Sequence, residues 1–183
     1  MKKAYIFFAD GFEEVEGLTV VDILRRGQID IKTVSITSSK NVISSHGIKL
    51  ETDMVFDEVK EEADMYILPG GMPGTKYLRD HEGLGNMLKN ANEDGKYLAA
   101  ICAAPTVFAK YGFTDGKNAT SYPGMESEMT GANYSFDKVV VDGNIITSRG
   151  LGTAILFAGT LLELLKGTKI KEEVLESIVY EDK

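Results

Sequence analysis

The sequence contains one cysteine, Cys102, in the stretch YLAAICAAP at residues 97–105. Cys102 stands where an apolar run typical of a buried strand passes into a run typical of a helix. A thiol at the start of a helix lies near its partly positive end, which favours the nucleophilic thiolate. A lone cysteine is also a common, inert packing residue. The neighbours of Cys102 must therefore decide between these two interpretations.

Two other stretches carry groups that could assist a thiol. The stretch DGFEEVEG at residues 10–17 contains Glu16, which lies a turn beyond the positions that helix capping explains. Gly70 and Gly71 follow an apolar run and allow the backbone to approach a ligand closely. The amides of Gly71 and Ala103 could donate to an oxyanion. A buried Glu16 beside a thiolate would be protonated and could move a proton.

Each stretch also has an ordinary explanation. A Pro-Gly-Gly sequence is often only a turn, and an acidic helix start complements the helix dipole. The two histidines, His46 and His81, are predicted in a turn and on an exposed helix face. A Cys-His dyad is therefore not evident, and neither a glutamine amidotransferase pattern nor a phosphate-binding loop is present.

Composition restricts the classes of protein. A length of 183 residues, with 43% apolar and 26% charged, predicts one globular domain over residues 1–183. A net charge of −8 without a basic cluster argues against nucleic-acid and membrane partners. One cysteine excludes a disulfide framework and a multi-thiolate zinc site, and no metal site is expected. Without a signal peptide or an apolar span, the predicted location is the cytoplasm.

The elements that must position these residues follow from apolar periodicity. Buried strands are predicted at residues 4–9, 29–37, 64–71 and 97–101. A first helix is predicted from an Asp10 cap, with Glu13 at its third position, to Gly27. Further helices are predicted at 75–94, 104–112, 152–167 and 170–180. Residues 47–56 indicate an exposed antiparallel strand or hairpin arm, 118–122 a short strand, and Asp142-Gly143 a hairpin turn.

Strands that alternate with helices predict a doubly wound α/β sandwich, whose mostly parallel sheet carries an added antiparallel hairpin. In such sheets, sites form beyond the carboxyl ends of the parallel strands. If the strands that precede Glu16, Gly71 and Cys102 are neighbours, these three residues meet at one edge.

Five stretches together resemble the ThiJ/PfpI superfamily, and within it the branch of the Parkinson-associated protein deglycase. They are FFADGFEEVEGLTVVDILRR, ADMYILPGGMPG, YLAAICAAPTVFAKYG, ATSYPGMES and IITSRGLGTAILFA, and the resemblance covers residues 3–178. It implies one flavodoxin-like domain of the class I glutamine amidotransferase-like type, forming a homodimer.

The resemblance also implies roles for single residues. Cys102 matches the reactive cysteine and Glu16 the carboxyl that hydrogen-bonds its sulfur. Gly71 and Ala103, with Gly70 beside them, match the backbone donors that face that sulfur. Arg149 matches an arginine beside the site, with a structural rather than a catalytic role. Tyr122 stands where human-type members carry a histidine, so proton transfer would depend on Glu16.

The activities attributed to this branch give two hypotheses. The first is a cysteine-dependent glyoxalase or deglycase, which converts small dicarbonyls such as methylglyoxal, or early glycation adducts, without a cofactor. The alternative is a non-catalytic redox sensor or chaperone-like stress protein that responds through oxidation of Cys102. The implied partners are a small aldehyde or dicarbonyl substrate and a second copy of the chain.

Overall fold

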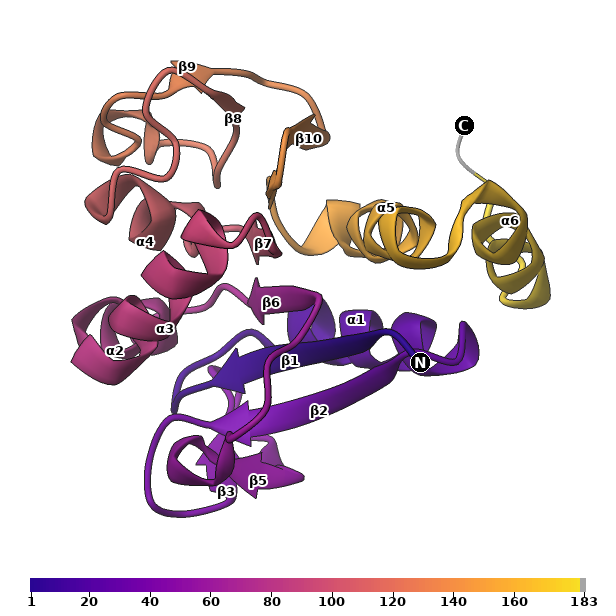
Figure 1. Cartoon of the computed structure of the whole chain (residues 1–183), viewed down its shortest axis with the longest axis horizontal. Helices are drawn as coiled ribbons and strands as arrows, with labels where there is room; N and C mark the ends of the chain where they lie inside the picture. The colour runs from indigo at the N-terminus through magenta and orange to yellow at the C-terminus, as the bar shows by residue number, and fades with distance from the viewer. Residues whose placement is uncertain (182–183) are drawn as a thin grey trace.

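A seven-stranded sheet forms the centre of the computed structural model, which describes residues 1–181 (Figure 1). The strand order is β10-β11-β7-β6-β1-β2-β5, and all neighbours are parallel except β10 and β11. These strands are β1 (Lys3–Phe8), β2 (Asp30–Ser35), β5 (Met54–Val55), β6 (Met65–Leu68), β7 (Tyr97–Ile101), β10 (Val139–Asp142) and β11 (Ile145–Ser148).

Helices cover both faces of this sheet (Figure 1). They are α1 (Glu14–Arg26), α2 (Gly74–Asp80), α3 (Glu82–Glu93), α4 (Pro105–Lys110), α5 (Ala154–Lys166) and α6 (Thr168–Ser177). Side chains of β1 alternate between the faces: Ile6 and Phe8 pack with the α1 and α5 side, whereas Tyr5 and Phe7 pack with the α3 and α4 side. The predicted doubly wound, flavodoxin-like sandwich is confirmed.

The antiparallel additions are small. The predicted turn at Asp142-Gly143 joins β10 to β11 at the sheet edge, as the sequence indicates. Residues 47–56 divide between two strands: β4 (Lys49–Glu51) pairs antiparallel with β3 (Asn41–Ile43), and β5 pairs parallel with β2. The predicted strand at 118–122 is reduced to β8 (Asn118–Ala119), which pairs with β9 (Asn133–Tyr134).

The predicted cap of the first helix is wrong. Asp10 does not cap α1, because its carboxylate accepts the backbone N–H of Ile43 (2.8 Å). Glu13 is the N-cap instead, and its carboxylate accepts the backbone N–H of Glu16 (2.7 Å). The helix therefore starts at Glu14, and Gly27 ends it as predicted.

The single helix predicted at 75–94 is two helices. α2 ends at Asp80 and α3 begins at Glu82, with His81 between them in an extended conformation. The Nδ1 atom of His81 accepts the backbone N–H of Leu84 (2.9 Å), so His81 caps α3 rather than lying on an exposed helix face.

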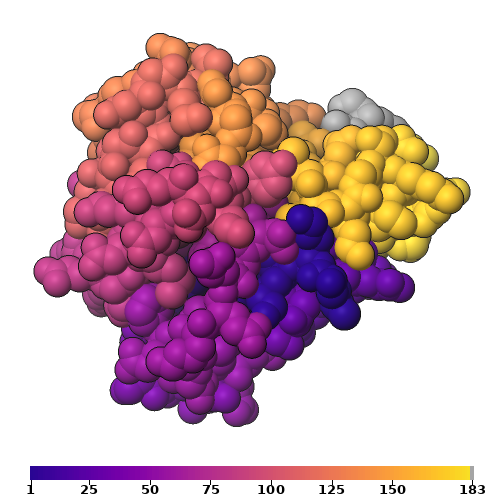
Figure 2. Space-filling view, in the orientation of Figure 1, coloured from indigo at the N-terminus to yellow at the C-terminus, as the bar shows by residue number. Residues whose placement is uncertain are grey.

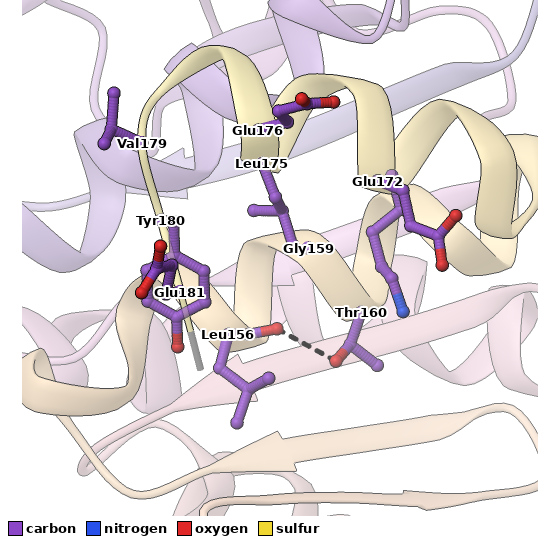
Figure 3. Close-up of a pocket in the computed structure, with 10 residues that line it drawn as sticks. Leu156, Gly159, Thr160, Glu172, Leu175, Glu176, Val179, Tyr180 and Glu181 are labelled. Carbon is purple, nitrogen blue, oxygen red and sulfur yellow. Dashed lines mark hydrogen bonds between the residues drawn. The ribbon is translucent and has the colours of Figure 1, made fainter. Parts of the chain in front are cut away.

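The C-terminal helices form a protruding lobe on one side of the molecule (Figure 2). A cavity of about 540 Å³ lies between α5 and α6, where Leu175 of α6 points toward Gly159 of α5 (Figure 3). None of the candidate site residues lines it. Among residues 1–181, no helix has the length and apolar character needed to cross a bilayer. The cytoplasmic location stays a prediction.

Candidate active site

The candidate residues meet at one edge of the sheet. The strands β7, β6 and β1 are adjacent, so the segments that follow their carboxyl ends lie together. The backbone N–H of Glu13 donates to the carbonyl of Gly70 (2.9 Å), which ties the start of α1 to the segment after β6. The expected meeting of Glu16, Gly71 and Cys102 is thus present.

Cys102 occupies a strained turn between β7 and α4. Its φ angle is 65°, a left-handed conformation that a residue with a Cβ rarely adopts. Two backbone hydrogen bonds hold the turn: Cys102 N–H donates to the Ser148 carbonyl (3.0 Å), and Tyr122 N–H donates to the Cys102 carbonyl (2.7 Å). The side chain remains partly exposed. This is the geometry of a nucleophile elbow, in which the surrounding fold imposes the conformation of the reactive residue.

Glu16 is buried beside the thiol. Its side chain is 1% exposed, and Oε2 accepts the backbone N–H of Gly70 (3.0 Å). The carboxyl group also forms hydrogen bonds with Cys102 and with the backbone of Leu151. Glu16 is therefore not a capping residue, because Glu13 supplies the cap and the Glu16 carboxyl points into the site.

Burial raises the pKa of both partners. Desolvation raises the pKa of Glu16 to about 7, although the hydrogen bond with Cys102 lowers it. Burial and then the charge of Glu16 raise the pKa of Cys102 to about 12, although the N–H groups of Ala103 and Gly71 lower it. Between these two values the pair holds one proton.

The electrostatics correct one expectation about the thiol. The sequence predicts a thiolate near a helix start and a protonated carboxyl beside it. Glu16 is protonated below about pH 7, as expected, but the thiol of Cys102 is protonated in the same pH range. The dipole of the six-residue helix α4 is outweighed by burial and by the adjacent carboxylate. A reactive sulfur therefore requires transfer of its proton, and Glu16 is the adjacent acceptor.

Two backbone amides face the sulfur. The N–H groups of Ala103 and Gly71 both form hydrogen bonds with Cys102. Gly71 has a φ of 94°, which directs its amide at low steric cost. A Cβ atom at Gly70 would lie 2.9 Å from the Cys102 sulfur and 2.5 Å from Glu16 Oε2. Glycine at 70 is thus what allows the backbone to approach this closely, and the amides can stabilise an oxyanion that forms next to the sulfur.

Tyr122 lies at the border of the site, whereas the side chain of Arg149 makes its contacts elsewhere. A Cβ at Gly150 would lie 3.4 Å from the Tyr122 ring and 3.8 Å from Glu16 Oε1. The Tyr122 ring and the Glu16 carboxyl group therefore both lie next to Gly150. Arg149 instead donates to the Phe136 carbonyl (3.1 Å), and its guanidinium lies 5.5 Å from the centre of the Phe136 ring. These contacts fit the structural role expected for Arg149.

Sequence reasoning missed the contributions of the end of β11 and of the segment that follows it. The carbonyl of Ser148 positions Cys102, and the backbone of Leu151 reaches Glu16. A contact made by a main-chain group does not depend on residue type, so the sequence does not reveal it. The Gly-rich stretch RGLG at 149–152 is the feature that indicates a close backbone approach here.

Among residues 1–181, one side-chain cluster could supply metal ligands. Ligand atoms of Glu13, Glu14 and His46 lie within 4.8 Å of one another. Each has an ordinary role: Glu13 caps α1, and His46 Nδ1 lies 2.9 Å from Glu14 Oε1. His46 is exposed, as the sequence predicts.

Comparison with known proteins gives consistent matches. The model of the DJ-1/PfpI family matches residues 2–164. Protein dj-1beta of Drosophila melanogaster is 38% identical over 182 residues, which cover 97% of each protein. The glutathione-independent glyoxalase DJR-1.2 of Caenorhabditis elegans is 31% identical over 169 residues, or 91% of this chain and 89% of that protein.

Other matches differ in the share of each protein that the alignment covers. Protein DJ-1 homolog B of Arabidopsis thaliana is 39% identical over 161 residues, which are 87% of this chain but only 37% of that longer protein. Among solved structures, oxidized DJ-1 of Toxoplasma gondii superposes with a TM-score of 0.96 at 31% identity, with all of both chains covered.

Proposed function

This chain belongs to the DJ-1/PfpI family, and from that premise we propose that it is a glyoxalase-type enzyme that acts on small dicarbonyls through Cys102. The observation that carries the proposal is the contact of one thiol with a carboxyl whose pKa is about 7 and with two backbone amides. A carboxyl with a pKa near neutrality is a suitable general base and acid at physiological pH. A relative that is named a glutathione-independent glyoxalase supports the same reaction class.

The first step is addition to the aldehyde. Glu16 accepts the thiol proton while the sulfur attacks the aldehyde carbon, so a C–S bond forms and the carbonyl π electrons move to oxygen. The amides of Gly71 and Ala103 stabilise that oxygen, which then takes the proton from Glu16. The product is a hemithioacetal.

The second step moves a proton between carbons. Glu16 removes the proton from the former aldehyde carbon, and the neighbouring carbonyl carbon is protonated through an enediol. The result is a thioester of Cys102, and water cleaves it to the hydroxy acid and the free thiol. Methylglyoxal and water thus give lactate with no change in net oxidation state. Early glycation adducts are a second substrate class for the same thiol, because they present a carbon bound to both oxygen and nitrogen at the oxidation level of the aldehyde.

Redox sensing is the second candidate function. A peroxide would transfer one oxygen to the sulfur and leave as water, which yields a sulfenic acid. Glu16 and the two amides could then hydrogen-bond the added oxygen. The observation that favours this function is Tyr122, because its hydroxyl cannot replace a histidine that titrates near neutrality.

The test is lactate formation from methylglyoxal. Wild type should turn over, whereas Cys102→Ser and Glu16→Gln should lose about a hundredfold or more of kcat/KM, the usual contribution of a nucleophile's base. Tyr122→His should increase kcat. Wild-type activity no higher than that of Cys102→Ser would contradict the proposed glyoxalase function. Rapid, Glu16-dependent oxidation of Cys102 by peroxide, measured by mass spectrometry, would then support the sensor.

A further inference from the structure

A second hollow adjoins the Cys102 site. Its volume is about 380 Å³, and its walls come from α2, α4 and the segment around Met125. Met72 lines it and directly follows Gly71. Thr106 also lines it, and its hydroxyl donates to the carbonyl of Ala103 (2.8 Å). The hollow is therefore bordered by the two chain segments that carry the amides of Gly71 and Ala103.

The hollow is positively charged in a chain of net charge −8. Three cations line it, Lys76, Arg79 and Lys110, against the two carboxylates of Asp80 and Glu128. Among residues 1–181 the ammonium group of Lys76 has no ion-pair partner. The excess positive charge attracts an anion.

The other two cations are held but remain available. Arg79 contacts Glu128 through one nitrogen (3.1 Å), and Lys110 lies 3.7 Å from Asp80. Lys110 also donates to the backbone carbonyl of Arg79 (2.7 Å), which holds its ammonium group at the end of α2. Exposed ion pairs contribute little stability, so an incoming anion can compete with these carboxylates at small cost.

A buried hydroxyl in the wall lacks a partner. Thr75 is 2% exposed, and its Oγ1 atom forms no hydrogen bond within the described residues. An unsatisfied buried hydroxyl costs free energy, and rotation of the Thr75 side chain toward the hollow that it lines would give this hydroxyl an oxygen of a bound ligand as its partner. This observation points to a ligand independently of the charges.

We propose that this hollow, lined by Thr75, Lys76, Arg79 and Lys110, binds the carboxylate or phosphate group of a substrate whose aldehyde reaches Cys102. The inference rests on the proposed function and narrows it: the preferred substrates are acidic 2-oxoaldehydes rather than neutral methylglyoxal. Carboxylate and phosphate share the oxygen acceptors that a lysine, an arginine fork and a hydroxyl recognise.

The kinetic test compares 2-oxoaldehydes with and without an acidic group. 4,5-Dioxopentanoate carries a carboxylate, its methyl ester does not, and 3-phosphooxy-2-oxopropanal carries a phosphate. Lys76→Gln and Thr75→Val should each raise KM for the better acidic substrate about fivefold to tenfold, the usual net effect of losing one hydrogen bond. KM for methylglyoxal and for the ester should not change. Lys60→Gln, which removes an exposed lysine outside the hollow, is the matched control.

A binding test separates this inference from the proposed function. Calorimetric titration of Cys102→Ser with succinate and with inorganic phosphate needs no turnover. Binding that Lys76→Gln weakens about fivefold and Lys60→Gln leaves intact supports the subsite, even if no glyoxalase activity is found. Methylglyoxal turnover without anion binding, or an equal effect of Lys76→Gln on acidic and neutral substrates, would contradict the proposed anion subsite. Either result would leave the proposed glyoxalase activity unaffected.

Discussion

Glu16 and Cys102 act as one titrating unit within a buried site, because the carboxylate of Glu16 raises the pKa of the thiol while the hydrogen bond from Cys102 lowers the pKa of the carboxyl group. Between pH 7 and 12 this unit holds a single proton, and the reactive form is the one in which the proton has moved from sulfur to carboxylate. At the scale of residues, the chemistry therefore depends on a shared proton more than on an acidic thiol.

This pairing predicts the pH profile of thiol alkylation. In wild type, the rate of Cys102 modification by iodoacetamide should rise through an inflection near pH 7, where Glu16 becomes a carboxylate that can accept the thiol proton. In Glu16→Gln the inflection near pH 7 should disappear, and only a rise at higher pH should remain. Stopped-flow alkylation from pH 5 to 10 measures this, and the same inflection in both proteins would contradict it.

Gly70 is predicted to be a position where one methyl group disables the site. In Gly70→Ala the new Cβ would meet the Cys102 sulfur and Glu16 Oε2, so one of them must move. A displacement of about 1 Å at reacting atoms can cost about a hundredfold in rate. Gly152→Ala is the matched control, since a Cβ there would contact nothing within 4 Å. Equal kcat/KM in the two variants would refute the close approach as a requirement.

The site residues could be found from sequence because their types are unusual at strand ends. A lone cysteine after YLAAI, a glutamate beyond the cap and two glycines after a strand each stand out. The cations of the second hollow do not, since Lys76 and Lys110 lie far apart in the chain among other surface lysines. Only the packing of α2 against α4 brings them together.

At the scale of elements, the sequence pattern located the strands β1, β2, β6 and β7, but the parallel pairing of β5 and the strand order required the structure. Order depends on which helix crosses which face, and that is a property of packing rather than of local pattern. The break at His81 was hidden for a related reason. The residues around it continue a helical periodicity, and the cap becomes visible only when Nδ1 is placed next to the N–H of Leu84.

The His81 cap gives a prediction about stability. His81→Ala should lower the free energy of unfolding by about 1 kcal/mol, the usual cost of losing an N-cap side chain. His81→Asn should restore most of it, because asparagine offers an oxygen acceptor at the same position. Urea unfolding followed by circular dichroism measures both. An unchanged midpoint in His81→Ala would mean that the Leu84 amide finds another partner.

At the scale of the whole molecule, the number of copies remains a prediction from the resemblance. A homodimer should sediment with twice the chain mass of 20.0 kDa, and its proportion should fall on dilution. Analytical ultracentrifugation over a hundredfold range of concentration measures this. A single species of 20.0 kDa throughout would exclude a stable dimer.

The buried carboxyl should also make the stability of the whole fold depend on pH. The pKa of Glu16 is about 7 in the folded protein and 4.5 as a reference for the unfolded chain, so the folded state binds this proton more tightly. The resulting stabilisation is complete below pH 4.5 and is lost as the pH rises through 7, by up to about 3 kcal/mol. Asp53 and Asp64 have lowered pKa values and titrate with the opposite sign, below this window. Urea unfolding at pH 5.5 and 8 should therefore show a loss of stability in wild type that Glu16→Gln lacks. An equal loss in both proteins would place the titrating group elsewhere.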